Sequence, residues 1–289
     1  MTIQSMGTVK DIMNEPITIS KDSTISDVIK KLLEQKIGRL LVSEDDKITS
    51  IITEKDICFF LLSDKTERML DQIHLTEISQ PVFSVDQSTT IKECARIMLE
   101  KGIGSVTVSS DDKIVGIVTK TDLTRYYAEN FAGEKSVGEY MSPYYAWVYS
   151  DTPLYCVIDK MLNDRVSRLI LRNKNETLEG ILSFRDLFFV SLYHGNEEDV
   201  IDSRDADIPV VFKRHGFLSD SGFGGTTTAK QIMTDAIITV NYDEDLAKSC
   251  NVLLDNGING VGVLSRYGTI IGILSKTDVV KCLSFISRD

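Results

Sequence analysis

The sequence of 289 residues contains 42% hydrophobic and 26% charged residues, proportions typical of a globular protein. Its net charge of −11 argues against a nucleic-acid-binding or anionic-membrane surface, because both depend on clustered lysine and arginine. The sequence also lacks the ~18 consecutive apolar residues of a membrane span, a secretory signal, and the cysteine pattern of a disulfide framework. We therefore expect a cytoplasmic protein that does not enter membranes and does not bind nucleic acid.

One short pattern occurs four times along the chain: an apolar strand ends in Ser or Thr, and Asp follows three residues later. The copies are SIITEKD (50–56), GIVTKTD (116–122), GILSFRD (180–186) and GILSKTD (272–278). Whole segments repeat with them, because a shift of 66 residues carries Asp56 onto Asp122 without a gap, and a shift of 92 carries Asp186 onto Asp278. A fixed period with matched chemistry indicates internal duplication. The chain is therefore predicted to hold two pairs of one small unit.

The second unit shows most clearly which elements one repeat contains. A short strand is expected at 82–85, followed within 91–104 by a helix that is ended by Gly102 and whose apolar residues recur at helical spacing. Residues 105–118 have the pattern of two strands around a turn at 110–112, and a second helix begins at 119. The predicted order is strand, helix, strand, strand, helix.

The predicted fold class is therefore α/β (α+β), with four β-α-β-β-α repeats. Their expected bounds are 7–63, 73–129, 134–191 and 226–286, with an insertion or linker at 192–225. A unit of this size buries too little surface to be stable on its own. We therefore expect the four units to form two pseudo-twofold pairs. The sequence leaves open whether both pairs pack into one disc-like assembly or each meets a pair from another chain.

These repeats resemble the CBS domain, the regulatory repeat named after cystathionine β-synthase. The resemblance is carried by the four terminal elements, by a strand start of the KIGRLLV type (36–42), and by three similar openings. The openings are VKDIMNEPITI (9–19), VGEYMSPYYAWV (137–148) and AKQIMTDAIITV (229–240). Membership of this family implies that the repeats work in pairs and that each pair has two symmetry-related clefts.

The resemblance also implies a ligand. Such clefts commonly hold adenosine-containing molecules such as AMP, ADP, ATP or S-adenosylmethionine, with the terminal Asp accepting hydrogen bonds from both ribose hydroxyls. In this chain the ribose acceptors would be Asp56, Asp122, Asp186 and Asp278. The hydroxyls near the ribose or first phosphate would be Thr53, Thr119, Ser183 and Ser275.

The four clefts are expected to differ in charge. At the start of the second strand, where some family members place an Arg that faces phosphate, the four repeats have Arg39, Ser105, Arg168 and Gly260. One residue before the ribose Asp they have Lys55, Thr121, Arg185 and Thr277. Repeats 1 and 3 should therefore favour phosphorylated nucleotides, whereas repeats 2 and 4 would suit an uncharged adenosyl group or rely on neighbouring residues. The alternative is that both arginines are surface charges beside a strand.

Several features depart from the family pattern or have a plainer explanation. Repeat 1 has Ser50 where the other repeats have Gly, near the expected purine position, and repeat 2 has Ser79 in place of the opening Met. Each Ser/Thr-x-x-Asp element is also an ordinary capping box at the start of a helix. Both roles can hold at once, because a capping Asp can also meet a ligand.

The sequence thus favours a stand-alone regulatory protein, not an enzyme, that binds an adenine nucleotide or related adenosyl ligand and needs no obligatory cofactor or metal. Its output would pass to an unknown effector protein, and a homodimer is the default assembly. One alternative is a structural or interaction scaffold with empty clefts. A remote alternative is an enzyme that uses the 192–225 insertion with His194 and His215.

Overall fold

The computed structural model describes residues 7–63, 68–192 and 227–286, and the expected insertion lies outside them from residue 193 onward. The chain divides into two compact units. One, here called the 2/4 unit, holds the described parts of residues 1–16, 82–145 and 238–289. The other, the 1/3 unit, holds the described parts of 17–81 and 146–237. Each unit thus combines elements of two repeats that are not neighbours in the sequence.

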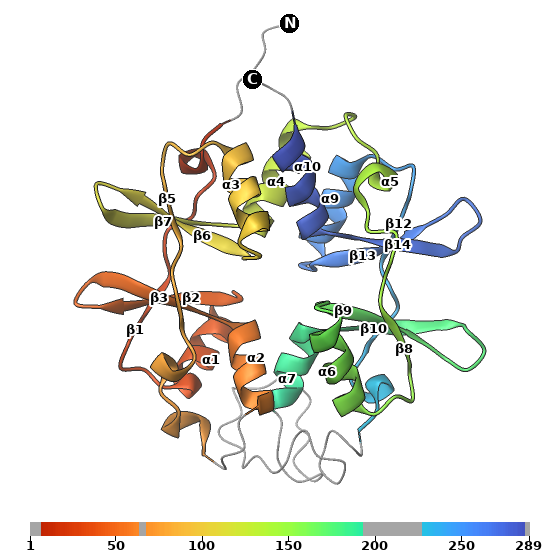
Figure 1. Ribbon diagram of the computed structural model, residues 1–289, viewed down its shortest axis with the longest axis horizontal. Coiled ribbons are helices and arrows are strands. Elements are labelled where there is room, and N and C mark those ends of the chain that lie inside the picture. The colour runs from red at the N-terminus through yellow and green to blue at the C-terminus, as the bar shows by residue number, and fades with distance from the viewer. Residues whose placement is uncertain (1–6, 64–67, 193–226, 287–289) are drawn as a thin grey trace, which may run out of the picture. The chain divides into compact units, whose positions relative to one another are not determined.

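The predicted order of elements is confirmed in all four repeats (Figure 1). Repeat 1 consists of β1 (Thr18–Ser20), α1 (Ile25–Glu34), β2 (Arg39–Glu44), β3 (Lys47–Thr53) and α2 (Glu54–Ser63). Repeat 2 consists of β5 (Ser84–Asp86), α3 (Ile91–Glu100), β6 (Ser105–Ser110), β7 (Lys113–Thr119) and α4 (Lys120–Asn130). Repeat 3 consists of β8 (Trp147–Tyr149), α6 (Leu154–Asn163), β9 (Arg168–Arg172), β10 (Leu178–Ser183) and α7 (Phe184–Leu192). Repeat 4 consists of β12 (Thr239–Asn241), α9 (Leu246–Asp255), β13 (Gly260–Leu264), β14 (Ile270–Ser275) and α10 (Lys276–Phe285).

Each repeat builds the same small sheet. Its first strand pairs parallel with the second, and the second and third form an antiparallel hairpin. In repeat 1 the hairpin turns through Asp45 and Asp46, and in repeat 2 through Asp111 and Asp112, all with positive φ. Two such residues in a row suit a tight hairpin turn, and aspartate tolerates this conformation better than most residues.

A short opening segment precedes the first strand of every repeat, and it pairs with the sheet of the tandem neighbour. These segments contain η1 (Val9–Asp11), η3 (Leu75–Glu77) with β4 (Gln80–Pro81), α5 (Val137–Tyr140), and η5 (Ala229–Gln231) with β11 (Thr234–Asp235). The four pairings have one register: Asn14 faces Ile117, Gln80 faces Ile51, Ser142 faces Ile273 and Thr234 faces Ile181. Repeats 1 and 2 therefore exchange opening segments, as do repeats 3 and 4, which joins them as tandem pairs.

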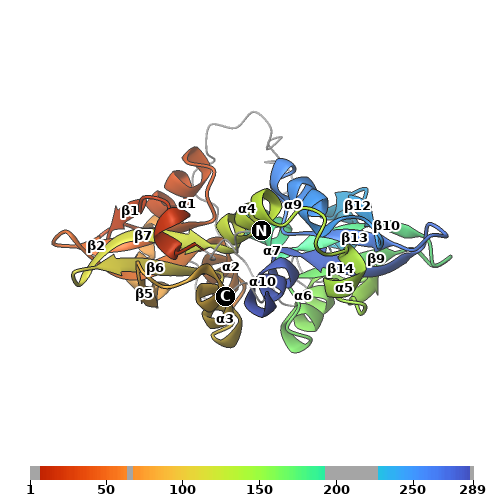
Figure 2. The ribbon, with the colours of Figure 1, turned by 90° about the horizontal axis from the view of Figure 1, so that it is seen from above.

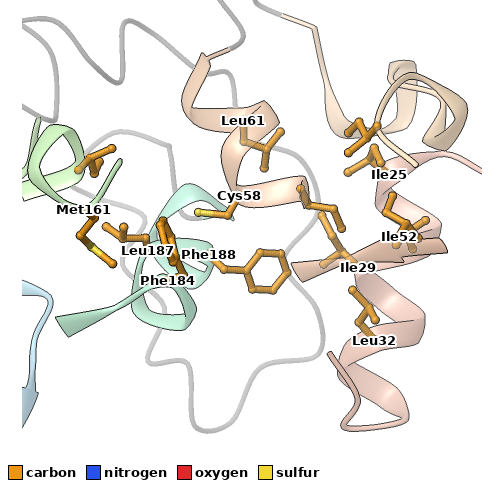
Figure 3. Packing of buried hydrophobic residues seen from close by; sticks show 14 of the residues in the cluster. Ile25, Ile29, Leu32, Ile52, Cys58, Leu61, Met161, Phe184, Leu187 and Phe188 are labelled. Carbon is orange, nitrogen blue, oxygen red and sulfur yellow. The ribbon is translucent and has the colours of Figure 1, made fainter. Parts of the chain in front are cut away.

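The hydrophobic cores connect the repeats differently. In the 2/4 unit, α4 packs against α9 and α10, and α10 also packs against α3 (Figures 1 and 2). In the 1/3 unit, α2 packs against α7, with Cys58 of α2 beside Leu187 and Phe188 of α7 (Figure 3). All three of these side chains are fully buried. Each repeat thus shares its core with one repeat and its opening segment with another.

Candidate functional site

The four Ser/Thr-x-x-Asp elements lie where the last strand of each repeat turns into its last helix, and each is called here a corner, named by its Asp. In every corner the Asp Oδ2 accepts two hydrogen bonds from the Ser or Thr three residues earlier, one from the backbone N–H and one from the hydroxyl. The hydroxyl-to-Oδ2 distances are 2.5 Å for Thr53–Asp56, 2.7 Å for Thr119–Asp122, 2.7 Å for Ser183–Asp186 and 2.6 Å for Ser275–Asp278. The capping interpretation is therefore confirmed, and it uses only one oxygen of each carboxylate.

The second carboxylate oxygen faces the exchanged opening segment. Asp122 Oδ1 accepts a hydrogen bond from Asn14 Nδ2 at 2.9 Å, Asp278 Oδ1 from Ser142 Oγ at 2.9 Å, and Asp186 Oδ1 from Thr234 Oγ1 at 3.1 Å. Sequence reasoning missed these three donors. The repeat offsets contained the signal, because all three residues directly follow an opening Met.

The Asp56 corner is different. The equivalent residue, Gln80, has the same register against β3, but its side-chain amide donates to the Ile78 carbonyl at 3.0 Å. Within the described part of the chain, Asp56 Oδ1 has no hydrogen-bond donor. Asp56 and Asp186 are half-buried, whereas Asp122 and Asp278 are buried, with 6% and 8% of their surface exposed.

The arginines expected near phosphate lie beside the corners. Arg39 is the register partner of Thr53 across β2 and β3, and Arg168 is the partner of Ser183 across β9 and β10. The same place opposite the capping hydroxyl is taken by Ser105 in repeat 2 and by Gly260 in repeat 4. The structure thus brings together each cation and corner that the sequence associated.

Lys55 and Arg185 are exposed, in the first turn of α2 and α7. The Lys55 ammonium lies 5.4 Å from the ring centre of Phe59 and 5.3 Å from that of Phe184, which belongs to repeat 3. Such cation–π contacts hold the lysine head group over the contact between α2 and α7. The corners of repeats 1 and 3 therefore meet within the 1/3 unit.

An acidic residue that sequence reasoning missed lies among these cations. Burial raises the pKa of Glu54 above its usual value, and the nearby Arg185 and Arg39 oppose that rise. Glu54 directly follows the capping hydroxyl of Thr53, a place taken by Lys120, Phe184 and Lys276 in the other repeats. Two arginines and one carboxyl group therefore interact electrostatically at this corner.

In the 2/4 unit, lysines reach across to the residues expected at the ligand. Lys120 Nζ donates to Thr277 Oγ1 at 3.0 Å, and Lys276 Nζ donates to Thr121 Oγ1 at 3.1 Å. Lys276 is buried, with 6% of its surface exposed. The corners of repeats 2 and 4 therefore each contain a lysine, Lys120 or Lys276, whose ammonium group contacts the threonine of the facing repeat.

The contact between each opening segment and its host sheet is very close at three corners. A Cβ on Gly116 would lie 2.5 Å from Met13 Sδ, a separation that real Cβ atoms do not show. A Cβ on Gly180 would lie 2.6 Å from the Thr234 carbonyl oxygen and 2.8 Å from Met233 Sδ, and one on Gly272 would lie 2.5 Å from the Ser142 carbonyl oxygen and 3.1 Å from Met141 Sδ. Glycine therefore allows the backbone and the Met of the opening segment to approach the strand closely at these positions.

No described helix is long and apolar enough to cross a membrane. In the same part of the chain, no three His, Cys, Asp or Glu side chains gather in a way that could hold a metal ion. His194 and His215, the residues of the remote enzyme hypothesis, lie outside the described residues.

Four exchanged, capped repeats of this kind define a protein built from CBS domains. The sequence matches the CBS domain family at residues 9–63, 75–129, 137–193 and 229–284. The chain therefore belongs to the CBS domain family.

Relatives match parts of the chain, and two solved structures match nearly all of it. An uncharacterized 17.7 kDa protein of Acidianus ambivalens is 35% identical over 117 residues, which cover 39% of this chain and 71% of that protein. Protein MJ1225 of Methanocaldococcus jannaschii is 28% identical over 126 residues, or 44% of its length. The crystal structure of MJ1225 has a TM-score of 0.75 at 20% identity and covers 95% of this chain and 99% of that one. A Pyrococcus horikoshii structure has a TM-score of 0.62 at 22% identity and covers 96% and 99%. Both likenesses concern the fold.

Proposed function

We propose that this chain is a regulatory protein that binds an adenine nucleotide or a related adenosyl ligand at its corners and passes the signal to an effector protein. The observation that carries the proposal is the divided role of each corner carboxylate. One oxygen caps the helix, and the other faces the opening segment of the tandem neighbour. A carboxylate presented in this way can accept from a vicinal diol, as the family resemblance implies for ribose.

The residues take the following roles in this proposal. Asp56, Asp122, Asp186 and Asp278 accept from the ribose hydroxyls, and Thr53, Thr119, Ser183 and Ser275 lie beside the ribose or first phosphate. Phosphate is met by Arg39 and Lys55 in repeat 1 and by Arg168 and Arg185 in repeat 3. Thr121 and Thr277 take the corresponding places in repeats 2 and 4, each with the lysine that contacts it.

The same geometry lets ligand binding change the conformation of the protein. A ribose hydroxyl that binds Asp122 Oδ1 competes with Asn14, whose hydrogen bond ties the opening segment of repeat 1 to repeat 2. Ser142 and Thr234 make the equivalent ties to Asp278 and Asp186. A ligand that prefers the untied arrangement would shift the population toward it, as regulation by differential affinity requires. The effector would then recognise the released opening segment, in a homodimer of cytoplasmic location.

A scaffold without ligand is the second candidate, and one observation favours it. Capping explains every retained Asp, and three of the four outer oxygens already have an intramolecular donor. Under this hypothesis the corners only stabilise the exchange of opening segments. No adenosyl compound would then raise the melting temperature.

The test is a thermal-shift panel of AMP, ADP, ATP, S-adenosylmethionine, NAD and GTP on the full chain, followed by calorimetry on each hit. A ligand at 100 times its dissociation constant stabilises the protein by about 2.7 kcal/mol, enough for a visible shift. We expect an adenosyl-selective shift that is reduced in Asp56→Ala and Asp186→Ala. The matched control is Asp27→Ala, because Asp27 forms the same capping box with Thr24 at the start of α1, away from any corner. Asp27→Ala should lower stability and leave ligand affinity unchanged.

A further inference from the structure

Two departures from the repeat pattern lie in one corner. Ser50 replaces the glycine of the last strand in repeat 1, and Ser79 replaces the opening Met of repeat 2. The two changes are 29 residues apart in the sequence. They lie on paired strands of one sheet, because repeat 2 lends its opening segment to repeat 1, where β4 pairs with β3 and Gln80 faces Ile51.

The shared register makes the two serines a matched pair. Gln80 faces Ile51, just as Asn14 faces Ile117 next to the contact between Met13 and Gly116. A Cβ at the glycine position clashes with a Met on the opening segment. By this register Ser50 takes the place of the glycine and Ser79 the place of the Met, so the added Cβ at position 50 is accompanied by a smaller side chain at position 79.

The two serines also change the chemistry of the corner. Three corners present a methionine thioether lying on glycine, an apolar surface, together with a carboxylate whose outer oxygen is already bonded. The Asp56 corner has two half-buried hydroxyls, Ser50 and Ser79, instead. Within the described residues, neither hydroxyl forms a hydrogen bond, and Asp56 Oδ1 also has no donor.

We propose that Ser50, Ser79 and Asp56 make this corner a separate class of ligand site, selective for a ribonucleotide that offers hydrogen-bonding groups to the serines. This inference rests on the proposed function, because it assumes that the corners bind ribose-containing ligands. A bound diol need not displace a side-chain donor from Asp56 Oδ1, so this corner fills at lower ligand concentration than the tied corners. Apolar contact with the heterocycle is weaker here, since the Met is missing, and polar groups on the ligand replace it.

The closing experiment is calorimetric titration of the full chain with AMP, ATP, GTP and S-adenosylmethionine. For wild type we expect two affinity classes, with the tighter one removed by Asp56→Asn. The double variant Ser50→Gly/Ser79→Met should convert the tight class toward the ligand preference of the other corners, lowering its affinity for the favoured nucleotide at least several-fold. Both changes are made together so that the glycine admits the new Met and the protein stays folded.

The reverse exchange is the matched control. Gly116→Ser/Met13→Ser gives the Asp122 corner the serine pair while its Asn14 donor stays in place. We expect the ligand preference of that corner to move toward that of the Asp56 corner. Identical affinities and preferences in wild type and both double variants would overturn the inference and leave the proposed function standing. No binding of any compound by folded wild type would instead reject the proposed function, and the inference with it.

Discussion

Asn14 Nδ2 donates a hydrogen bond of 2.9 Å to Asp122 Oδ1, across 108 residues of sequence. The bond joins the opening of the first repeat to the last helix of the second, at the oxygen that the helix cap leaves free. The structure therefore combines, at one carboxylate, a helix cap, a tie between tandem repeats and the proposed contact with ligand.

Removing this tie should affect stability and binding in opposite directions. Asn14→Ala deletes a hydrogen bond to a carboxylate, so we expect the free energy of unfolding to fall by about 1.5–3 kcal/mol. The diol then no longer competes with Asn14, so ligand affinity at this corner should rise, by up to about tenfold for 1.4 kcal/mol. Denaturant titration and calorimetry measure the two effects. A loss of stability together with weaker binding would contradict the competition between Asn14 and ligand.

Gly116 and Met13 should behave as a coupled pair. Gly116→Ser places a Cβ against the Met13 thioether, and overpacking of this kind costs about 1–3 kcal/mol. Met13→Ser in the same chain removes the contact with Sδ, the closest atom, so the double variant should be more stable than the Gly116→Ser single. A double-mutant cycle from urea denaturation gives the coupling directly. Additive effects would show that the two residues do not meet as described.

Glu54 should make stability fall as pH rises. Burial raises its pKa above the ordinary value of 4.5, with Arg185 and Arg39 opposing, so the folded state holds the proton more tightly than the unfolded state. Its stabilising contribution is present below about pH 4.5 and is lost as pH rises through the folded-state pKa. Glu54→Gln should therefore flatten this part of the stability profile, measured by urea denaturation at several pH values.

Asp27 provides the comparison of opposite sign. Its backbone and side-chain hydrogen bonds with Thr24 lower its pKa, so its contribution is lost as pH falls through the folded value. Asp27→Asn should reduce the loss of stability as pH falls. Glu54→Gln should instead reduce the loss of stability as pH rises. Equal pH profiles for wild type and Glu54→Gln would contradict the raised pKa of Glu54.

Glu54 should also weaken the binding of phosphate. Glu54 lies close to Arg39 and Arg185 and repels an incoming anion when it is charged. Glu54→Gln should raise affinity for ATP more than for adenosine, because only ATP brings phosphates. Calorimetry with both compounds separates the two. An equal gain for both would point to a change in packing instead of charge.

The cysteines should divide sharply in reactivity. Burial raises the pKa of Cys58 and of Cys94 to about 12, so almost no thiolate is present at pH 8. Cys250 and Cys282 are also buried, and Cys156 is half-exposed. An aromatic disulfide reagent should thus modify Cys156 first in the native protein and all five thiols in denaturant. Fast native modification of Cys58 would contradict its burial between α2 and α7.

The repeat pattern predicted most of the fold, because the elements of one repeat are determined by local signals. The helix over Ile91–Glu100 follows from apolar spacing, and the hairpin turn at Asp111 and Asp112 from turn chemistry. The capping role of the four corners could also be predicted from the sequence, since Ser/Thr-x-x-Asp is a local motif. The secondary structure of each repeat is determined by residues that are close together in the sequence.

The relations between repeats were harder to predict. That Ser50 and Ser79 lie on paired strands, or that Asn14 contacts Asp122, depends on which sheet receives each opening segment. Two similar segments compete for two similar sheets, and no local signal distinguishes them. The lysines that reach Thr121 and Thr277 depend on how repeats 2 and 4 share a core. In the sequence, the exchange of opening segments was indicated only by Ser50 and Ser79, which both depart from the repeat pattern.

The most direct test of the account compares AMP with its 2′,3′-dideoxy analogue by calorimetric titration of the full chain. The analogue keeps the base and the phosphate and lacks both hydroxyls that the corner carboxylates would accept. We predict that AMP binds and that the analogue binds at least about 100-fold weaker, as expected when about 2.7 kcal/mol of charge-assisted hydrogen bonding is lost. Equal affinity for the two compounds would contradict the assignment of Asp56, Asp122, Asp186 and Asp278 as ribose acceptors.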